Sequence, residues 1–219
     1  MDAAGKGRSD LELGGSAVSV GPSFDDISLA PAERVLARPF SDLEATTHDL
    51  EVLSGIRIAQ RERLDEGHGC GTWIDRNGAT HWLVAPRPER VLASVPCLAV
   101  GFFGQARSDV DHTIIVQLEH AMLARAKEIP GLIAYHNVQL ANAQWGNLVL
   151  FEAGTETAPM RADPIYADAI GRAPAHYHSL RLHRGTLVRC ADNAEAIELG
   201  TTLYLDFDTT PPWRAMRAS

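Results

Sequence analysis

Val100-Gly-Phe-Phe-Gly104 stands in the first of the predicted strands that decide the fold of this chain. Downstream of it, segments with the alternation of a β-strand and segments with the spacing of an amphipathic helix follow one another, separated by proline and glycine residues. The predicted order is strand, helix, strand, strand, helix, strand. Its segments are residues 97–105, 109–129, 131–140, 147–152, 163–174 and 177–185.

The two glycines of the first strand do not belong to a phosphate-binding loop, because their spacing matches neither GxGxxG nor GxxxxGK. Glycine inside a strand is typical of a bulge, or of a place where another group comes close to the backbone. We therefore expect Gly101 and Gly104 to allow a bulge or a close approach within the sheet.

The sequence before this module has two different compositions. The first part is rich in Gly, Ser, Ala and charged residues, which predicts disorder. The second has a β-like pattern from His48 to Val84, in which Asn77-Gly78 predicts a hairpin at about 71–85 because both residues tolerate positive φ. The predicted divisions are a tail at 1–23, a β-rich extension at 24–96, and the main module with a C-terminal extension at 97–219.

Composition excludes several classes of partner. The formal net charge is -8 and the chain has no long basic run, so neither nucleic acid nor an anionic membrane surface is an expected partner. No apolar run reaches the roughly 18 residues that span a bilayer, and the start of the chain does not look like a signal peptide. The three cysteines, at unrelated spacings, predict a reducing cytoplasm and no CxxC metal pair.

The order of elements predicts a fold. A βαββαβ chain forms a four-stranded antiparallel sheet with both helices on one face. The other face would then be an exposed apolar patch, which soluble proteins avoid. Pairing two such sheets would cover this face and enclose a cavity, so we expect a homodimer. The alternative is that strands from 24–96 extend the sheet and close a barrel within one chain.

The segments Val100–Gly104, Gly146–Phe151 and Tyr177–Gly185 resemble the dimeric α+β barrel superfamily. This superfamily includes antibiotic-biosynthesis monooxygenases, chlorite-dismutase-like haem proteins and stress-responsive barrel proteins, and the resemblance covers residues 97–186. It implies an α+β fold in which a ferredoxin-like βαββαβ module forms a dimeric barrel, here with an additional N-terminal β-hairpin region. It also implies oxidative or tailoring chemistry of a monooxygenase-like kind, or a haem-dependent activity.

Alternation on the last strand selects the first candidate residues. Leu180 and Leu182 share one face, and Tyr177, Arg181 and His183 share the other. If the leucines pack on the helices, Arg181 and His183 point into the barrel, where Arg181 would hold an anionic group and His183 would move protons. The alternative is that both lie at an exposed strand end.

His136 is the other catalytic candidate, because it lies in the middle of a predicted strand. It would be a general base, a haem ligand, or a core histidine with a hydrogen-bond partner. His176 and His178 are two residues apart, as metal ligands on a strand would be, but no third ligand is fixed, so no metal site is predicted. The residues predicted to bind the substrate are Phe103, Tyr135, Trp145 and Tyr177.

These observations lead to one functional prediction and two alternatives. The leading prediction is a cytoplasmic, homodimeric enzyme that acts on a small, hydrophobic, anionic organic molecule inside a barrel cavity. The first alternative is a haem protein, since one axial histidine is enough to hold the iron. The second is a non-catalytic protein that binds a ligand or mediates assembly. The sequence selects neither a substrate nor a cofactor.

Overall fold

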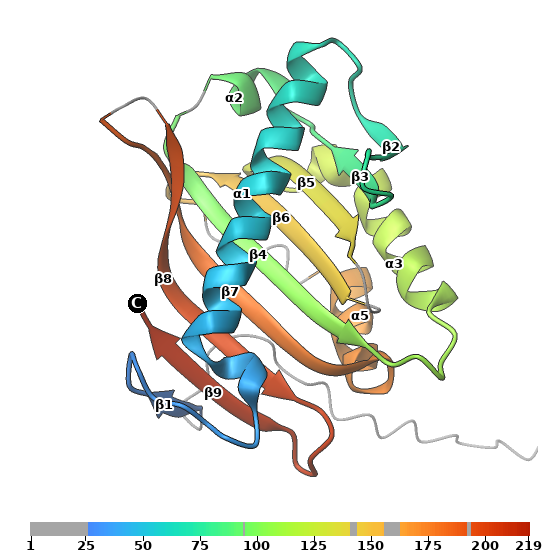
Figure 1. Ribbon diagram of the computed structural model, residues 1–219. Coiled ribbons are helices and arrows are strands. Elements are labelled where there is room, and N and C mark those ends of the chain that lie inside the picture. The colour runs from blue at the N-terminus through green and yellow to red at the C-terminus, as the bar shows by residue number, and fades with distance from the viewer. Residues whose placement is uncertain (1–25, 94, 141–143, 156–162, 192–193) are drawn as a thin grey trace, which may run out of the picture.

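The computed structural model describes residues 26–93, 95–140, 144–155, 163–191 and 194–219, and the predicted tail at 1–23 lies outside them. The described strands form one mixed sheet in the order β1-β9-β8-β7-β4-β6-β5-β3-β2 (Figure 1). Only the β1–β9 pair is parallel among them. The strands are β1 Ile27–Leu29, β2 Gly71–Ile74, β3 Thr80–Val84, β4 Cys97–Ala106, β5 Leu132–Gln139, β6 Gln144–Glu152, β7 Tyr177–Arg189, β8 Glu195–Asp206 and β9 Trp213–Ala218.

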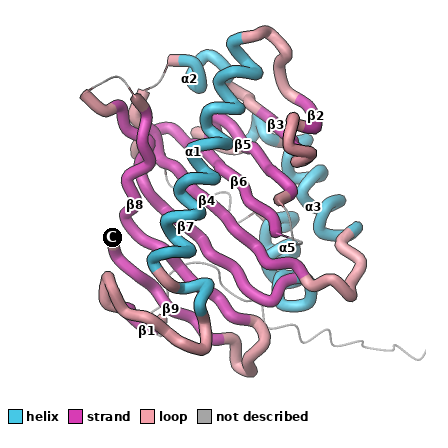
Figure 2. Tube along the Cα trace, in the orientation of Figure 1, coloured by secondary structure: helices cyan, strands magenta, loops and turns pink. Residues whose placement is uncertain are grey.

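Helices cover both faces of this sheet (Figure 2). The long helix α1 crosses one face diagonally, whereas α3 and α5 lie next to each other on the opposite face. The helical segments are η1 Pro39–Ser41, α1 Leu43–Asp65, α2 Pro88–Leu92, α3 Thr113–Ala124, η2 Ala126–Glu128 and α5 Pro164–His176.

The predicted fold class is therefore wrong. The strands and helices expected within 97–186 are present in the expected order, but they form the centre of a nine-stranded sheet and not a small ferredoxin-like module. Strands β8, β9 and β1 extend the sheet beyond β7, and β3 and β2 extend it beyond β5. The face that was expected to be bare is covered by α1 of the same chain. An exposed apolar face therefore no longer supports the prediction of a homodimer.

The β-like pattern predicted from His48 onward is also wrong for its first part, which forms α1. The buried residues of α1 have helical spacing, but most of them are polar, so hydrophobicity does not repeat at that spacing. The apparent strand alternation at Ile56-Arg57-Ile58 is misleading, because Ile58 is 57% exposed on the helix surface. The buried residues are Thr46, Asp49, Leu53, Ile56, Arg57 and Gln60.

Two local predictions are confirmed. Strands β2 and β3 form the hairpin, and Gly78 takes a φ of 83° in its turn. Helix α5 begins as predicted, because the Asp163 carboxylate accepts a hydrogen bond from the backbone N–H of Ile165 at 2.8 Å. Pro174 lies within the last turn of α5, which continues to His176.

The glycines of β4 allow close approach on both faces of the sheet, as predicted. A Cβ atom on Gly101 would lie 2.7 Å from a methyl carbon of Leu53, which belongs to α1. A Cβ atom on Gly104 would lie 2.6 Å from the ring of Tyr177, on the face that carries α3 and α5. These two glycines bring a helix and an aromatic ring directly onto the strand.

Candidate functional site

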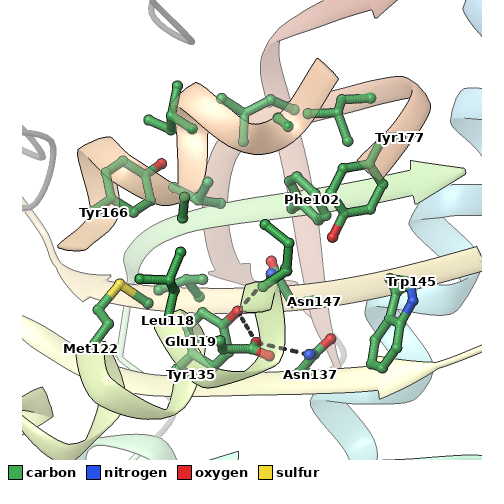
Figure 3. A pocket seen from close by; sticks show the side chains of 18 of the residues that line it. Phe102, Leu118, Glu119, Met122, Tyr135, Asn137, Trp145, Asn147, Tyr166 and Tyr177 are labelled. Atoms are coloured by element: carbon green, nitrogen blue, oxygen red, sulfur yellow. Dashed lines mark hydrogen bonds between the residues drawn. The ribbon is translucent and has the colours of Figure 1, made fainter. Parts of the chain in front are cut away.

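A cavity of about 180 Å³ lies between the sheet and the helices α3 and α5 (Figure 3). Most of its wall is apolar, as is usual for sites that bind small molecules. The lining residues come from β4, β5, β6, β7, α3 and α5, and His112 directly precedes α3. They are Val100, Phe102, His112, Ile115, Val116, Leu118, Glu119, Met122, Tyr135, Asn137, Trp145, Asn147, Val149, Phe151, Ile165, Tyr166, Ala169, Ile170, Ala173, Tyr177, Leu180, Leu182 and Arg184.

Four polar side chains of this wall form one hydrogen-bonded cluster. Glu119 Oε1 accepts hydrogen bonds from the Tyr135 hydroxyl at 2.5 Å and from Asn137 Nδ2 at 2.8 Å. Asn147 Nδ2 donates in turn to the Tyr135 hydroxyl at 3.0 Å. Glu119 Oε2 forms no hydrogen bond with another described residue. One carboxylate oxygen is therefore held by the protein, and the other is available to a ligand.

Strand and helix geometry explain why these residues meet. Tyr135 and Asn137 are two residues apart on β5, so both point to the same face of the sheet. Asn147 lies opposite Asn137 in the register of β5 and β6. Glu119 is four residues after Ile115 and three before Met122, so all three lie on one face of α3. Regular structure therefore fixes the cluster, with no contribution from loops.

The environment of Glu119 changes its ionisation. Burial among apolar side chains raises its pKa to about 7, although the hydrogen bonds from Tyr135 and Asn137 act in the opposite direction. Burial also raises the pKa of Tyr135 well above its usual value, and the nearby charge of Glu119 adds to this effect. Tyr135 thus remains a hydrogen-bond donor, while Glu119 can gain or lose a proton near neutrality.

Replacing Glu119 with glutamine should make the protein relatively more stable at high pH. The pKa of Glu119 is raised in the folded state, so its contribution to stability is complete below its ordinary value of 4.5 and is lost as the pH rises through about 7. A shift of this size corresponds to at most about 3 kcal/mol. The free energy of unfolding of Glu119→Gln, relative to that of the wild type, should increase by up to that amount from pH 5 to pH 8. Urea unfolding at the two pH values measures this change.

The matched control for this measurement is Glu128→Gln. Glu128 is an exposed residue of η2 that pairs with Arg125 on the surface. The difference in stability between this variant and the wild type should stay nearly constant from pH 5 to pH 8. A constant difference for Glu119→Gln as well would show that Glu119 has an ordinary pKa.

The predicted catalytic pair Arg181 and His183 lies on the opposite face of the sheet, beneath α1. From Leu180 to His183 the alternation on β7 is as inferred, with Leu180 and Leu182 facing the cavity. Tyr177 was expected on the face of Arg181 and His183, but it lines the cavity, because the register of β7 against β4 shifts next to it. Arg181 Nη2 donates to Asp49 Oδ1 at 2.8 Å, and His183 Nε2 lies 2.8 Å from Asp49 Oδ2. Helix α1 therefore occupies the space in which the barrel cavity was expected, and these two side chains point at the helix.

His136 also faces α1 and not the cavity. Its side chain is fully buried, and its Nε2 lies 3.0 Å from Nδ1 of His81. Burial lowers the pKa of His136 to about 3, and the neighbouring His81 and Arg63 act in the same direction. A neutral imidazole held in this way corresponds to the core histidine that was one of the three alternatives for this position.

The predicted substrate-binding residues divide between the two faces. Tyr135, Trp145 and Tyr177 line the cavity. Phe103 packs beneath α1, where its ring centroid lies 5.6 Å from that of His183. The sequence patterns did not point to Glu119, Asn137 or Asn147. For Glu119 there was a signal, since it is a carboxylate between apolar residues at helical spacing.

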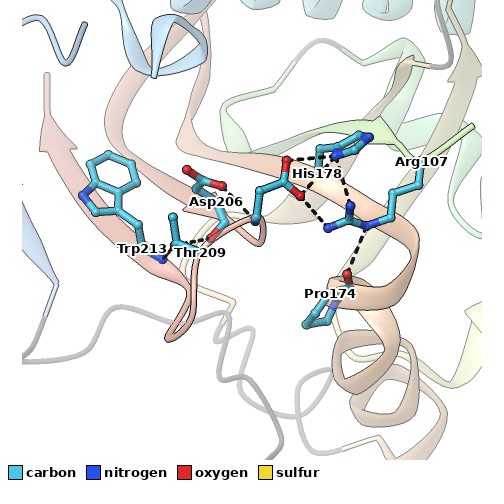
Figure 4. Close-up of polar contacts among 7 residues, drawn as sticks. Arg107, Pro174, His178, Asp206, Thr209 and Trp213 are labelled. Carbon is cyan, nitrogen blue, oxygen red and sulfur yellow. Dashed lines mark hydrogen bonds and ion pairs between the residues drawn. The ribbon is translucent and has the colours of Figure 1, made fainter. Parts of the chain in front are cut away.

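The histidines at the ends of α5 and β7 do not form a metal site with each other. His178 Nδ1 lies 2.9 Å from Asp208 Oδ2, and Arg107 Nη2 lies 2.7 Å from Asp208 Oδ1 (Figure 4). Among the described residues, no three His, Cys, Asp or Glu side chains are arranged to hold a metal ion. Partly exposed ion pairs such as these typically stabilise a protein by only about 0–1 kcal/mol.

No helix within the described ranges is long and apolar enough to cross a membrane.

Comparison with known proteins gives no match, whether to a protein-family model, a curated protein or a solved structure.

Proposed function

We propose that this protein binds a small, neutral, largely apolar organic molecule in the cavity and exchanges a proton with it through Glu119. The observation that carries this proposal is the position of the Glu119 carboxyl group. It lies in an apolar wall, with Oε1 held by two donors and Oε2 left for a ligand. A group whose pKa is close to the working pH is an effective general acid or base.

The proposed function agrees with the sequence prediction on the kind of reaction and differs from it on the charge of the substrate. Proton transfer is one form of the tailoring chemistry that was expected, but the expected anionic substrate rested on Arg181, which is paired with Asp49 on the other face. An anion would be repelled by ionised Glu119. Arg184 also lines the cavity, but it already takes part in another interaction of the chain. A neutral molecule fits this wall better.

Haem is not favoured by any observation on the described residues. The haem alternative rested on an axial histidine in the cavity. His136 lies on the other face, and His112, which does line the cavity, has its Nε2 at 2.7 Å from the backbone oxygen of Arg107. A visible spectrum recorded after adding haem to the purified protein should therefore show only the Soret band of free haem, without the shift that axial ligation by a histidine causes.

The binding of phenol and benzoate tests the proposal, because the two probes are similar in size and differ in charge. At pH 8, phenol should bind at least about tenfold more tightly than benzoate, a difference of about 1.4 kcal/mol. In Glu119→Gln this preference should largely disappear, whereas Glu128→Gln should retain it. Titrations followed by ligand-observed NMR measure both affinities.

Two results would contradict the proposal. If neither probe binds, or if benzoate binds better at pH 8, the cavity is not a site for neutral molecules. The proposed proton exchange by Glu119 is tested separately, by a ¹³C NMR titration of the glutamate carboxyl groups. The spectrum of Glu119→Gln assigns the signal of Glu119. A Glu119 pKa near its ordinary value of 4.5 would exclude proton transfer near neutral pH.

A further inference from the structure

Tyr177 presents a second polar group to the cavity, separate from the Glu119 cluster. It is the first residue of β7, directly after α5, and its ring lies over Gly104 and against the edge of Phe102, with ring centroids 5.9 Å apart. Its hydroxyl group points away from α5 into the cavity (Figure 3). None of the described residues forms a hydrogen bond with this hydroxyl. It is therefore available to a bound molecule.

The position of this ring is fixed by its surroundings. Only glycine fits at position 104, because a Cβ atom there would overlap the Tyr177 ring. The ring is 9% exposed, and burial raises the pKa of its hydroxyl far above the ordinary value, with the charge of Glu119 adding to the effect. Tyr177 thus keeps its proton at neutral pH and acts as a hydrogen-bond donor in a fixed direction.

Glu119 and Tyr177 reach the same cavity from different elements, α3 and the start of β7. Glu119 offers a proton acceptor, and Tyr177 offers a donor that does not ionise. A carbonyl compound needs this combination for enolisation, with a base beside its α-carbon and a donor at its oxygen. The apolar wall between the two groups fits a hydrocarbon skeleton, and the absence of net positive charge on these two groups fits a neutral carbonyl better than a carboxylate.

We propose that the substrate is a small, apolar aldehyde or ketone with an acidic α-hydrogen, and that Glu119 and Tyr177 convert it reversibly into its enolate. This inference rests on the proposed function. Glu119 Oε2 takes the α-proton, and the electron pair of the broken C–H bond forms the C=C bond of the enolate. The π electrons of the carbonyl move to its oxygen, where the Tyr177 hydroxyl donates a hydrogen bond.

The second half of the reaction restores Glu119. The protonated carboxyl returns its proton to the α-carbon or, in a β,γ-unsaturated ketone, to the γ-carbon, which moves the double bond into conjugation. Atoms and electrons balance without an oxidant or a reductant. Of the two groups, Glu119 carries the proton, and Tyr177 stabilises the negative charge on oxygen. Removing one such donor typically costs about 10²–10³ in rate.

Exchange of the α-protons of cyclohexanone for deuterium tests this inference. Measured by ¹H NMR with the full chain in D₂O near neutrality, the wild type should accelerate exchange well above the buffer rate. Tyr177→Phe should lower this acceleration by about 10²-fold, because the phenyl ring keeps the shape and loses the donor. Glu119→Gln should abolish it, and Glu128→Gln should leave it unchanged. Conversion of 3-cyclohexen-1-one to its conjugated isomer should follow the same pattern.

The outcomes separate this inference from the proposed function. If cyclohexanone and phenol bind but exchange runs at the buffer rate, the carbonyl chemistry is wrong and the neutral-ligand site stands. If no neutral probe binds, both are wrong. Equal acceleration by the wild type and Tyr177→Phe would remove Tyr177 from the reaction. Thermal unfolding and the affinity for phenol check that each variant keeps its fold and its cavity.

Discussion

Replacing Asp49 with asparagine should lower the free energy of unfolding by about 3–5 kcal/mol, the usual cost of removing one partner of a buried ion pair. Asp49 is fully buried on the side of α1 that faces the sheet. Its carboxylate accepts hydrogen bonds from Arg181, at 2.5 Å and 2.8 Å, and His183 lies 2.8 Å from it. In the variant, the guanidinium group would remain buried opposite a neutral amide that presents a donor of its own. Urea unfolding at pH 7 measures this effect.

The effect of Asp49→Asn should depend on pH in a defined direction. Burial alone would raise the pKa of Asp49, but the hydrogen bonds and charges of His183 and Arg181 together outweigh it and lower the pKa. Its stabilising contribution is therefore present above the ordinary value of 3.8 and is lost as the pH falls through the lower, folded-state value. The stability of the wild type should accordingly approach that of the variant at strongly acidic pH.

Asp65→Asn is the control, because Asp65 is an exposed residue at the end of the same helix. This change should alter stability by no more than about 0.5 kcal/mol. An equally small effect of Asp49→Asn at pH 7 would mean that α1 does not cover Arg181 as described, and the face predicted for catalysis would again be open to a ligand.

The burial of Arg181 and His183 shows what strand alternation can predict and what it cannot. It correctly separated Leu180 and Leu182 from Arg181 and His183, because that division depends only on the geometry of one strand. It could not reveal which element covers each face. That depended on α1, whose buried side is so polar that its hydrophobic pattern does not resemble a helix packed on a sheet.

The candidate site could not be predicted in full from the sequence for a related reason. The elements that build it were predictable, since α3, β5 and β6 all follow clear patterns and Tyr135 was selected as a substrate-binding residue. Glu119, however, was not selected, because a carboxylate on a helix is normally solvated. Its partners Asn137 and Asn147 meet only through the pairing of two strands, and single-strand patterns do not contain the register.

Replacing Leu53 with alanine should lower the free energy of unfolding by about 2–5 kcal/mol, as large-to-small changes in a core do. Leu53 is 1% exposed and belongs to the core cluster between α1 and the sheet. Its methyl groups lie directly over Gly101, at the point where the helix crosses β4. The loss will be near the upper end of this range if α1 cannot move toward the strand and fill the void that the substitution leaves.

Gly101→Ala should couple to this change. In the wild type, the added methyl group would lie 2.7 Å from Leu53 Cδ1 and force the side chain or the helix to move, at a cost of about 1–3 kcal/mol. In Leu53→Ala, the same methyl group would enter the space that the leucine vacated. The double variant should therefore be more stable than the sum of the two single changes predicts, by about 0.5–3 kcal/mol, in a double-mutant cycle measured by urea unfolding.

Gly171→Ala provides the matched control for this cycle. A Cβ atom on Gly171 in α5 would meet nothing within 4 Å, so the change should stabilise the helix modestly, by up to about 1 kcal/mol. Its effect should be the same with and without Leu53→Ala, because the two sites lie on opposite faces of the sheet. If Gly101→Ala also combined additively with Leu53→Ala, the side chain of Leu53 would not rest on β4 at Gly101, contrary to the packing described.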